Sequence, residues 1–160
     1  MEHSQKNVRS EEQRQQGFTL LEVIMAISIL TIGLLAVATM QGSAMRANAV
    51  ATDLTNAATI AADRMEKLAA LGYGDVNLED RDGDGASGLE DTGFDKNPLT
   101  TADADYRTNR HTATGKAYAV YWNVAIDDAT AGTKTINIIV AWDERGREKK
   151  VSLRLIKPQL

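Results

Sequence analysis

The chain has 160 residues, a formal net charge of −4 and no cysteine. This length fits one domain with an added helix, and the acidic balance disfavours nucleic acid as a direct partner. The lack of cysteine excludes disulfides, thiolate metal sites and a cysteine nucleophile.

The first predicted element is an apolar helix that follows a polar segment. Residues 1–16 carry equal numbers of basic and acidic side chains. Gly17 and the segment Phe18–Glu22 follow, and then come 23 residues without a charge, Val23–Met45. About 20 apolar residues cross the roughly 30 Å core of a bilayer, so this run is long enough to span a membrane. Two other interpretations fit less well. A buried core helix of this length would show a polar face, and a secretory signal peptide would have its cleavage site after the apolar run, not before it.

Glu22 stands near the start of this apolar helix and needs a partner, because a charge inside a bilayer is costly. Cutting the chain after Gly17 would make Phe18 the new amino terminus. Its ammonium group would then pair with Glu22 of the same chain, as i and i+4 neighbours on a helix, or with Glu22 of a neighbouring subunit. Only the second pairing makes Glu22 a residue for assembly.

The segment GFTLLEVIMAISIL resembles the cleavage and methylation motif of type IV pilins and of type II secretion pseudopilins, with matches at Gly17, Phe18, Thr19, Leu20 and Glu22. The resemblance implies that a prepilin peptidase cuts between Gly17 and Phe18 and methylates the amino group of Phe18. It also implies that Glu22 acts in assembly with other pilin subunits, in a hetero-oligomeric filament.

The resemblance also predicts how the chain is divided and where it lies in the cell. Residues 1–17 are a leader that is removed, and residues 18–45 are the transmembrane and filament-core half of a long helix. Basic residues flank the start of the span more than its end, which favours a cytoplasmic head, one pass through the inner membrane and a periplasmic carboxy-terminal domain. The mature subunit would then reach a pilus on the cell surface. The phrase TIGLLAVATMQ, Thr31–Gln41, resembles the minor pilins called type IV pilus modification proteins (PilV).

Residues 46–74 are predicted to continue the same helix as an amphipathic half. Helix-forming residues fill Ser43–Leu71, and Gly72 and Gly74 provide a stop. Apolar residues recur at spacings of three and four and so form a stripe for packing on a globular domain. These residues are Val50, Leu54, Ala57, Ala61, Met65 and Leu68.

Residues 75–115 are predicted to be an acidic loop region, and Asp75–Asp105 alone holds ten acids against two bases. Within it, DRDGDGASGLED has the spacing of a calcium-binding loop, with Gly85 at the sixth position, where such loops turn sharply. The predicted ligands are Asp80, Asp82, Asp84, Ala86 through its carbonyl, Glu90 and Asp91. Because an Asp replaces the usual final Glu and no amphipathic helix follows, a lone calcium loop is predicted; a solvated acidic turn is the alternative.

Residues 116–160 are predicted to form an antiparallel sheet. Three segments alternate with period two: AYAVYWNVAI, KTINIIVAW and KKVSLRLI. Their polar, glycine-containing connectors suit hairpins, and Trp122 and Trp142 are predicted to lie in the core. The expected fold class is therefore α+β and pilin-like, with a long amino-terminal helix packed on a small antiparallel β-meander.

The sequence favours a structural subunit over an enzyme. Neither histidine has metal-ligand spacing, and no nucleotide-binding, nucleophile-elbow or zinc-protease motif occurs. The leading interpretation is a PilV-type minor pilin that assembles or primes a type IV pilus. The alternatives are a minor pseudopilin of a type II secretion system and a membrane-anchored calcium-binding or adhesive module.

Overall fold

The computed structural model describes residues 18–93 and 103–159. The described residues form one long helix, two short 3-10 helices and four strands. These are α1 (Leu20–Ala70), η1 (Val76–Leu78), η2 (Gly85–Gly88), β1 (Tyr106–His111), β2 (Ala117–Ile126), β3 (Thr133–Asp143) and β4 (Glu148–Pro158). The chain divides into two compact units, Met1–Arg46 and Ala47–Leu160.

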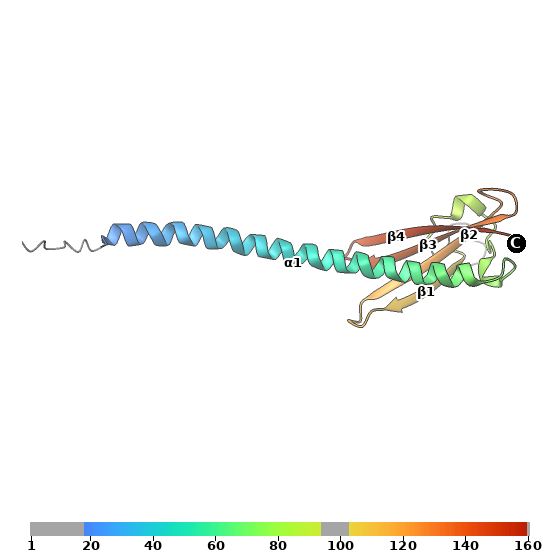
Figure 1. Cartoon of the computed structure of the whole chain (residues 1–160), viewed down its shortest axis with the longest axis horizontal. Coiled ribbons are helices and arrows are strands. Elements are labelled where there is room, and N and C mark those ends of the chain that lie inside the picture. The colour runs from blue at the N-terminus through green and yellow to red at the C-terminus, as the bar shows by residue number, and fades with distance from the viewer. Residues whose placement is uncertain (1–17, 94–102, 160) are drawn as a thin grey trace, which may run out of the picture. The chain divides into compact units, whose positions relative to one another are not determined.

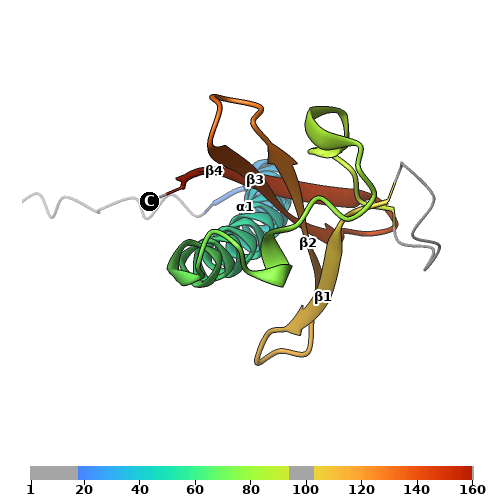
Figure 2. The same ribbon diagram turned by 90° about the vertical axis from the view of Figure 1, so that its right-hand side faces the viewer.

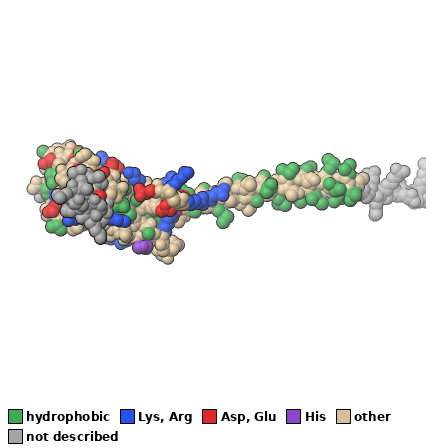
Figure 3. All heavy atoms as spheres, turned by 180° about the vertical axis from the view of Figure 1, so that it is seen from behind, with side chains coloured by type: hydrophobic (Ala, Val, Ile, Leu, Met, Phe, Trp, Pro, Cys, Tyr) green, Lys and Arg blue, Asp and Glu red, His purple; other side chains and the backbone are tan. Residues whose placement is uncertain are grey.

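The first unit contains the amino-terminal part of α1, which exposes its apolar side chains on all sides. Large hydrophobic residues from Leu20 to Met45 are exposed, and Figure 3 shows such side chains along this part of the helix. This segment is long and apolar enough to cross a membrane. A helix that is apolar all round needs an apolar environment, which lipid or the apolar helices of other subunits would supply.

The second unit packs the carboxy-terminal half of α1 across one face of the sheet (Figures 1 and 2). Ala57, Ala61 and Leu68 are buried there against alternate side chains of β2 and β3. The small alanines let the helix backbone approach the large aromatic side chains of the sheet. Trp122 and Trp142 lie in this core, as predicted.

The strands form an antiparallel meander in the order β1-β2-β3-β4. This arrangement, with one long helix on a small antiparallel sheet, confirms the predicted α+β pilin-like fold. The three strands expected within residues 116–160 are present. Strand β1 is an addition, because it lies in the segment 75–115 that was expected to be loop; its sequence YRTNRH has no apolar alternation that would predict a strand.

The stripe predicted on the helix is buried only in part. Val50 and Leu54 remain about half exposed, whereas Ile60 and Met65 pack against the core. Packing on the sheet therefore begins near Ala57. The helix starts at Leu20, two residues after Phe18, and ends at Ala70, one residue before Leu71, where the helix-forming residues were expected to stop.

The second face of the sheet is covered by the loop between α1 and β1, which Figure 2 shows on the side opposite the helix. Asn123 and Asn137 lie on this face, and each is more than 95% buried. Both side-chain amides donate to the carbonyl oxygen of Leu89, over 3.2 Å and 2.6 Å. Strands β2 and β3 are thus buried on both faces, with an apolar face toward α1 and a mixed face toward the loop, whereas β1 and β4 remain largely exposed.

Two lysines from the sheet hold the end of α1 and the segment that follows it. Lys157 on β4 donates to the carbonyl oxygen of Ala69 at 2.7 Å. Lys134 on β3 is buried and donates to the carbonyl oxygens of Tyr73 and Leu78 at 2.9 Å and 2.6 Å. Positive charge at this helix terminus is favourable, because the last carbonyl groups of a helix lack internal partners.

Candidate functional site

The start of α1 carries the residues of the amino-terminal motif. Gly17 lies outside the described residues, while Phe18 is described and 82% exposed. Thr19 caps the helix: its side-chain oxygen accepts from the amide of Glu22 at 3.3 Å, and its carbonyl oxygen accepts from the amide of Val23. Sequence reasoning missed this cap, although Thr-x-x-Glu before an apolar run is a known signature of a helix start.

The position of this cap affects the predicted pairing of Glu22. The same-chain option placed Phe18 and Glu22 on one helical face, but α1 begins only at Leu20. Phe18 precedes the cap, so the helical spacing of four residues does not apply to this pair. Glu22 itself is exposed in the first turn, where a carboxylate interacts favourably with the helix dipole.

Two backbone amides of the acidic loop donate to the carboxylate of Asp80. One carboxylate oxygen accepts from the amide of Gly83 at 2.8 Å, and the other accepts from the amide of Gly85 at 3.1 Å. Both glycines have positive φ, at 75° and 59°. Gly85 therefore makes the turn that was predicted for the sixth position of a calcium loop.

A buried acid from outside the loop joins this turn. The carboxylate oxygens of Asp80, Asp82 and Asp105 lie within 4.8 Å of one another. Asp105 is only 6% exposed, and its oxygens accept from the amides of Arg81 and Val124 at 2.5 Å and 2.7 Å. Sequence reasoning missed Asp105, because it lies 24 residues beyond Arg81 and reaches the loop only through the fold.

Crowding of these acids shifts their proton affinity. Burial, with the nearby carboxylates of Asp82, Asp91 and Asp80, raises the pKa of Asp84 to about 7. Burial also raises the pKa of Asp105 to about 6, even though two backbone amides favour its charged form. The Oδ2 atom of Asp84 is buried without a hydrogen-bond partner among the described residues. The cluster therefore holds negative charge at a cost that protons or a cation would relieve.

The other predicted ligands have different surroundings. The carboxylate of Glu90 accepts from Asn137 at 3.2 Å and from Arg154 at 3.3 Å, which directs it to the sheet. Ala86 lies exposed in η2. Asp91 is close enough to Asp82 for their charges to interact, and burial with this repulsion raises its pKa.

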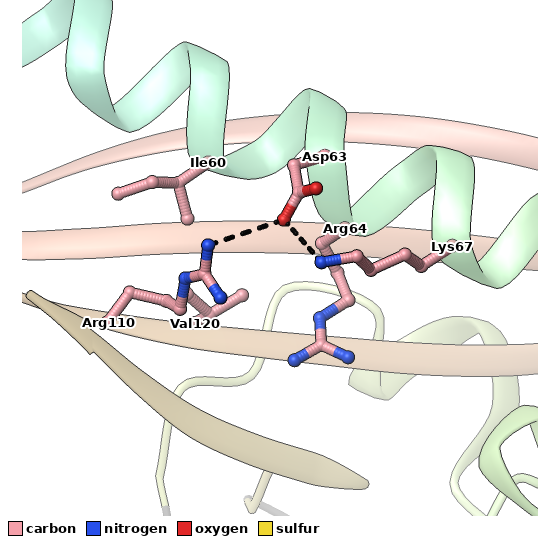
Figure 4. Close-up of a pocket in the computed structure, with 6 residues that line it drawn as sticks. All are labelled: Ile60, Asp63, Arg64, Lys67, Arg110 and Val120. Carbon is pink, nitrogen blue, oxygen red and sulfur yellow. Dashed lines mark hydrogen bonds and ion pairs between the residues drawn. The ribbon is translucent and has the colours of Figure 1, made fainter.

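A small pocket between α1 and the sheet holds an ion-pair cluster (Figure 4). Asp63 lies between Lys67, at 2.8 Å, and Arg110 on β1, at 3.6 Å. The hydrogen bond from Lys67 lowers the pKa of Asp63. Arg64 extends from the helix over the ring of Trp122, with its guanidinium carbon 4.4 Å from the ring centroid. These contacts tie the helix to β1 and β2 and form no catalytic arrangement.

Comparison with known proteins identifies one match. The family model of the prokaryotic N-terminal methylation motif matches residues 13–38. No curated protein and no solved structure matches the chain. The matched segment contains the sequence around Gly17, Phe18 and Glu22 and the first part of α1. It supports a type IV pilin-like protein that a prepilin peptidase cleaves and that assembles with other pilins, and the long apolar helix fits membrane anchoring.

Proposed function

We propose that the chain is a minor pilin of the PilV type, a structural subunit that assembles or primes a type IV pilus. The observation that carries the proposal is the methylation motif at residues 13–38, which runs directly into a 51-residue helix with an apolar first part. The precursor crosses the inner membrane once, with its second unit in the periplasm. Removal of residues 1–17 and methylation of Phe18 then prepare it for the filament and the cell surface.

Glu22 is the proposed assembly residue. Its carboxylate is exposed in the first turn of α1, and Phe18 lies before the helix begins. A same-chain pair at helical spacing would require the helix to extend two residues further toward the amino terminus. Pairing with the methylated amino terminus of a neighbouring subunit needs no such extension. This pairing neutralises a charge that would otherwise remain alone among apolar helices.

The mass of the mature protein tests the processing step. A chain that begins at Phe18 and carries one added methyl group is the expected product. A Gly17→Ile variant should keep the unprocessed mass, because a branched side chain at the cleaved bond blocks the peptidase, while Gln16→Ala is the matched control. A mature protein that retains residues 1–17 would contradict the proposal.

The choice between a pilus and a secretion pseudopilus rests on the Thr31–Gln41 phrase, which resembles PilV proteins. The competing function is a minor pseudopilin of a type II secretion system, which shares the motif. Deletion of the gene should abolish or reduce surface pili and leave secreted enzymes unchanged. Lost secretion with normal pili would replace this proposal with the pseudopilin function.

We further propose that the acidic loop binds calcium. The supporting observations are the convergence of Asp80, Asp82 and Asp105 and the positive φ of Gly85. Calcium prefers six to eight oxygen ligands, and the carboxylates of the loop and of Asp105, the residue just before β1, provide several of them. Asp84 and Asp91 lie in the same cluster, whereas Glu90 is bonded to Asn137 and Arg154 and is left out of the proposed ligand set.

Calorimetry on the full chain in detergent tests this site. Calcium should bind the unaltered chain, and the Asp80→Asn, Asp82→Asn variant should give no binding heat. Glu90→Gln is the matched control and should bind calcium as the unaltered chain does. Equal heats from all three proteins would remove the proposed site. A calcium-binding or adhesive module without a role in assembly is the remaining alternative, and it predicts normal function in a Glu22→Val variant.

A further inference from the structure

The end of the sheet that carries the β1–β2 and β3–β4 hairpins is rich in basic residues. Ala119 faces Ala141 in the register of β2 and β3, so both hairpins lie at the same end. Exposed cations here are Arg110, Arg145, Arg147, Lys149 and Lys150. Among the residues that the structure describes, the four cations of the β3–β4 hairpin form no ion pair. On the face in Figure 3, several Lys and Arg side chains lie at one end of the domain, together with Asp and Glu side chains.

The β3–β4 hairpin, residues 143–150, has three acids, Asp143, Glu144 and Glu148, against four cations, so the acids only partly offset the cations. Asp143 accepts from the amide of Gly146 at 3.1 Å and so serves the turn itself. Glu144 lines an open groove with Arg145, Arg147 and Lys149, and Val50 of α1 forms the opposite wall. The groove therefore places three cations and one acid beside a half-exposed apolar residue of the helix.

The tip of this hairpin keeps a cation in an unfavourable conformation. Arg145 and Gly146 both have positive φ, at 57° and 75°, and the backbones of Glu144 and Arg147 exchange two hydrogen bonds across the turn. Such turns prefer Asn, Asp or Gly at the position that Arg145 occupies. Retaining arginine there is a local strain, and strained residues gather at functional positions.

The opposite end of the same unit is acidic. Asp127 and Asp128 form the β2–β3 hairpin there, and the acidic loop lies near this end because Lys134, just beyond the hairpin, bonds to the carbonyl oxygens of Tyr73 and Leu78. Lys134 is buried and does not offset the acids at the surface. Lys157, paired with Lys134 in the register, lies at this end as well and bonds to the carbonyl oxygen of Ala69. The unit thus has an excess of cations near Val50 and an excess of acids near the end of α1.

The basic end is tied by the chain to the apolar run. Val50 follows Met45, the last residue of that run, by five positions. Five residues span at most about 18 Å even when fully extended. If the run crosses a membrane, the basic end cannot lie far from the lipid headgroups. An anionic bilayer attracts Lys and Arg within about a Debye length, which is roughly 8–10 Å at moderate salt.

We propose that this basic end docks on the headgroups of anionic phospholipids and holds the second unit against the bilayer until the subunit is assembled. The inference rests on the proposed membrane anchoring. The acidic end then points away from the like-charged surface. Docking positions the subunit with Val50 toward the membrane, and entry into a filament releases it.

Energy transfer to lipid headgroups measures this docking. The chain has no cysteine, so Ala113→Cys in the basic β1–β2 hairpin and Ala131→Cys in the acidic β2–β3 hairpin each give a single dye position. The full chain is reconstituted in vesicles of phosphatidylcholine alone, or of an equimolar mixture with phosphatidylglycerol, with an acceptor on the headgroups. Flotation with the vesicles first establishes anchoring in each lipid.

Transfer from position 113 should be greater in the anionic vesicles and should fall in high salt, while transfer from position 131 should not rise. Replacing Arg145, Arg147 and Lys149 by Gln should remove the difference, since each charge shifts the docked population about fivefold. Arg145→Lys with Arg147→Lys should retain it. Equal transfer in both lipids from a chain that floats would overturn the inference, and it would favour an acidic protein as the binding partner of this end. A chain that does not float would overturn the anchoring proposal, and this inference with it.

Discussion

Asn123 and Asn137 face each other across β2 and β3, and their side chains share the carbonyl oxygen of Leu89 as an acceptor. Asn123 also donates to the carbonyl oxygen of Asp91 and accepts from the amide of Asp105. One pair of amides therefore joins Leu89, Asp91 and Asp105 of the acidic segment to the middle of the sheet. The geometry of the carboxylate cluster depends on these bonds.

Replacing Asn123 by Leu should destabilise the second unit by about 1–3 kcal/mol, because the amide of Asp105 and the carbonyl oxygen of Asp91 would lose a buried partner. Urea unfolding of the full chain in detergent measures the change. Calcium affinity should fall as well, since Asp105 would lose its fixed position. Ser152→Ala, at an exposed site on β4, is the matched control and should change stability by less than about 0.5 kcal/mol. An unchanged unfolding midpoint for Asn123→Leu would contradict this role.

The pKa values of Asp84 and Asp105 predict how stability depends on pH. Both are raised, to about 7 and about 6, from an ordinary value of 3.8. Between about pH 4 and pH 7, the folded chain therefore binds more protons than the unfolded chain. Its stability falls as pH rises through this range. In the presence of a chelator, the chain should melt at a lower temperature near pH 8 than near pH 5.

Calcium should oppose this loss because the cation replaces the protons. At a calcium concentration one hundred times the dissociation constant, the expected stabilisation is about 2.7 kcal/mol. At one fixed calcium concentration, the stabilisation should be larger near pH 8 than near pH 5, because protons compete with calcium for the carboxylates. Asp84→Asn with Asp105→Asn should flatten the pH profile. Thermal unfolding with and without chelator provides both measurements. A metal-free chain that becomes more stable as pH rises through this range would contradict the prediction.

Glu22→Val should allow leader removal and methylation but prevent incorporation into filaments. Valine suits a membrane better than glutamate, so insertion is retained, while the partner for the amino terminus of the next subunit is lost. Immunoblots of membrane and sheared-filament fractions, with the mass of the mature chain, separate the two steps. Glu66→Val makes the same change at another exposed position of α1 and is the control. Normal amounts of Glu22→Val in filaments would reject the assembly role.

Thr19→Ala should loosen the first turn of α1, because the amide of Glu22 loses its side-chain acceptor. Loss of such a cap costs about 1 kcal/mol of helix stability. Amide exchange in micelles should be faster over the first turn and unchanged near Ala61. Thr19→Ser keeps the hydroxyl and should keep the protection. Equal exchange rates in the alanine variant would show that the cap contributes nothing to the start of the helix.

Sequence patterns predicted the strands in which apolar side chains recur with period two. In β2, β3 and β4 these side chains pack toward α1, and the predicted strands match the observed ones within two residues at each end. Burial itself alternates only in β4, because the loop covers the other face of β2 and β3. Strand β1 has no such signal, because its exposed side chains are polar and pairing with β2 alone makes it a strand. The sequence of β1 alone therefore does not predict its pairing with β2.

The candidate metal cluster shows the same limit. The loop spacing placed Asp80 and Asp82 together, and their carboxylate oxygens lie within 4.8 Å of each other because a short turn sets their separation. Asp105 joins them through its bond to the amide of Val124, and Glu90 is drawn away by Arg154, 64 residues along the chain. Long-range contacts therefore decide which carboxylates converge, and only the fold supplies them.

The two lysines at the end of α1 have a mechanical consequence. Lys157 and Lys134 come from β4 and β3, neighbouring strands that are joined along their full length. A pull on α1 therefore reaches β4 directly through Lys157, and it reaches β3 through Lys134, which holds the segment just after the helix. The sheet resists it through the hydrogen bonds that join these two strands. In a filament under tension, the helix would carry the force, and these two attachments would keep the sheet from separating from α1.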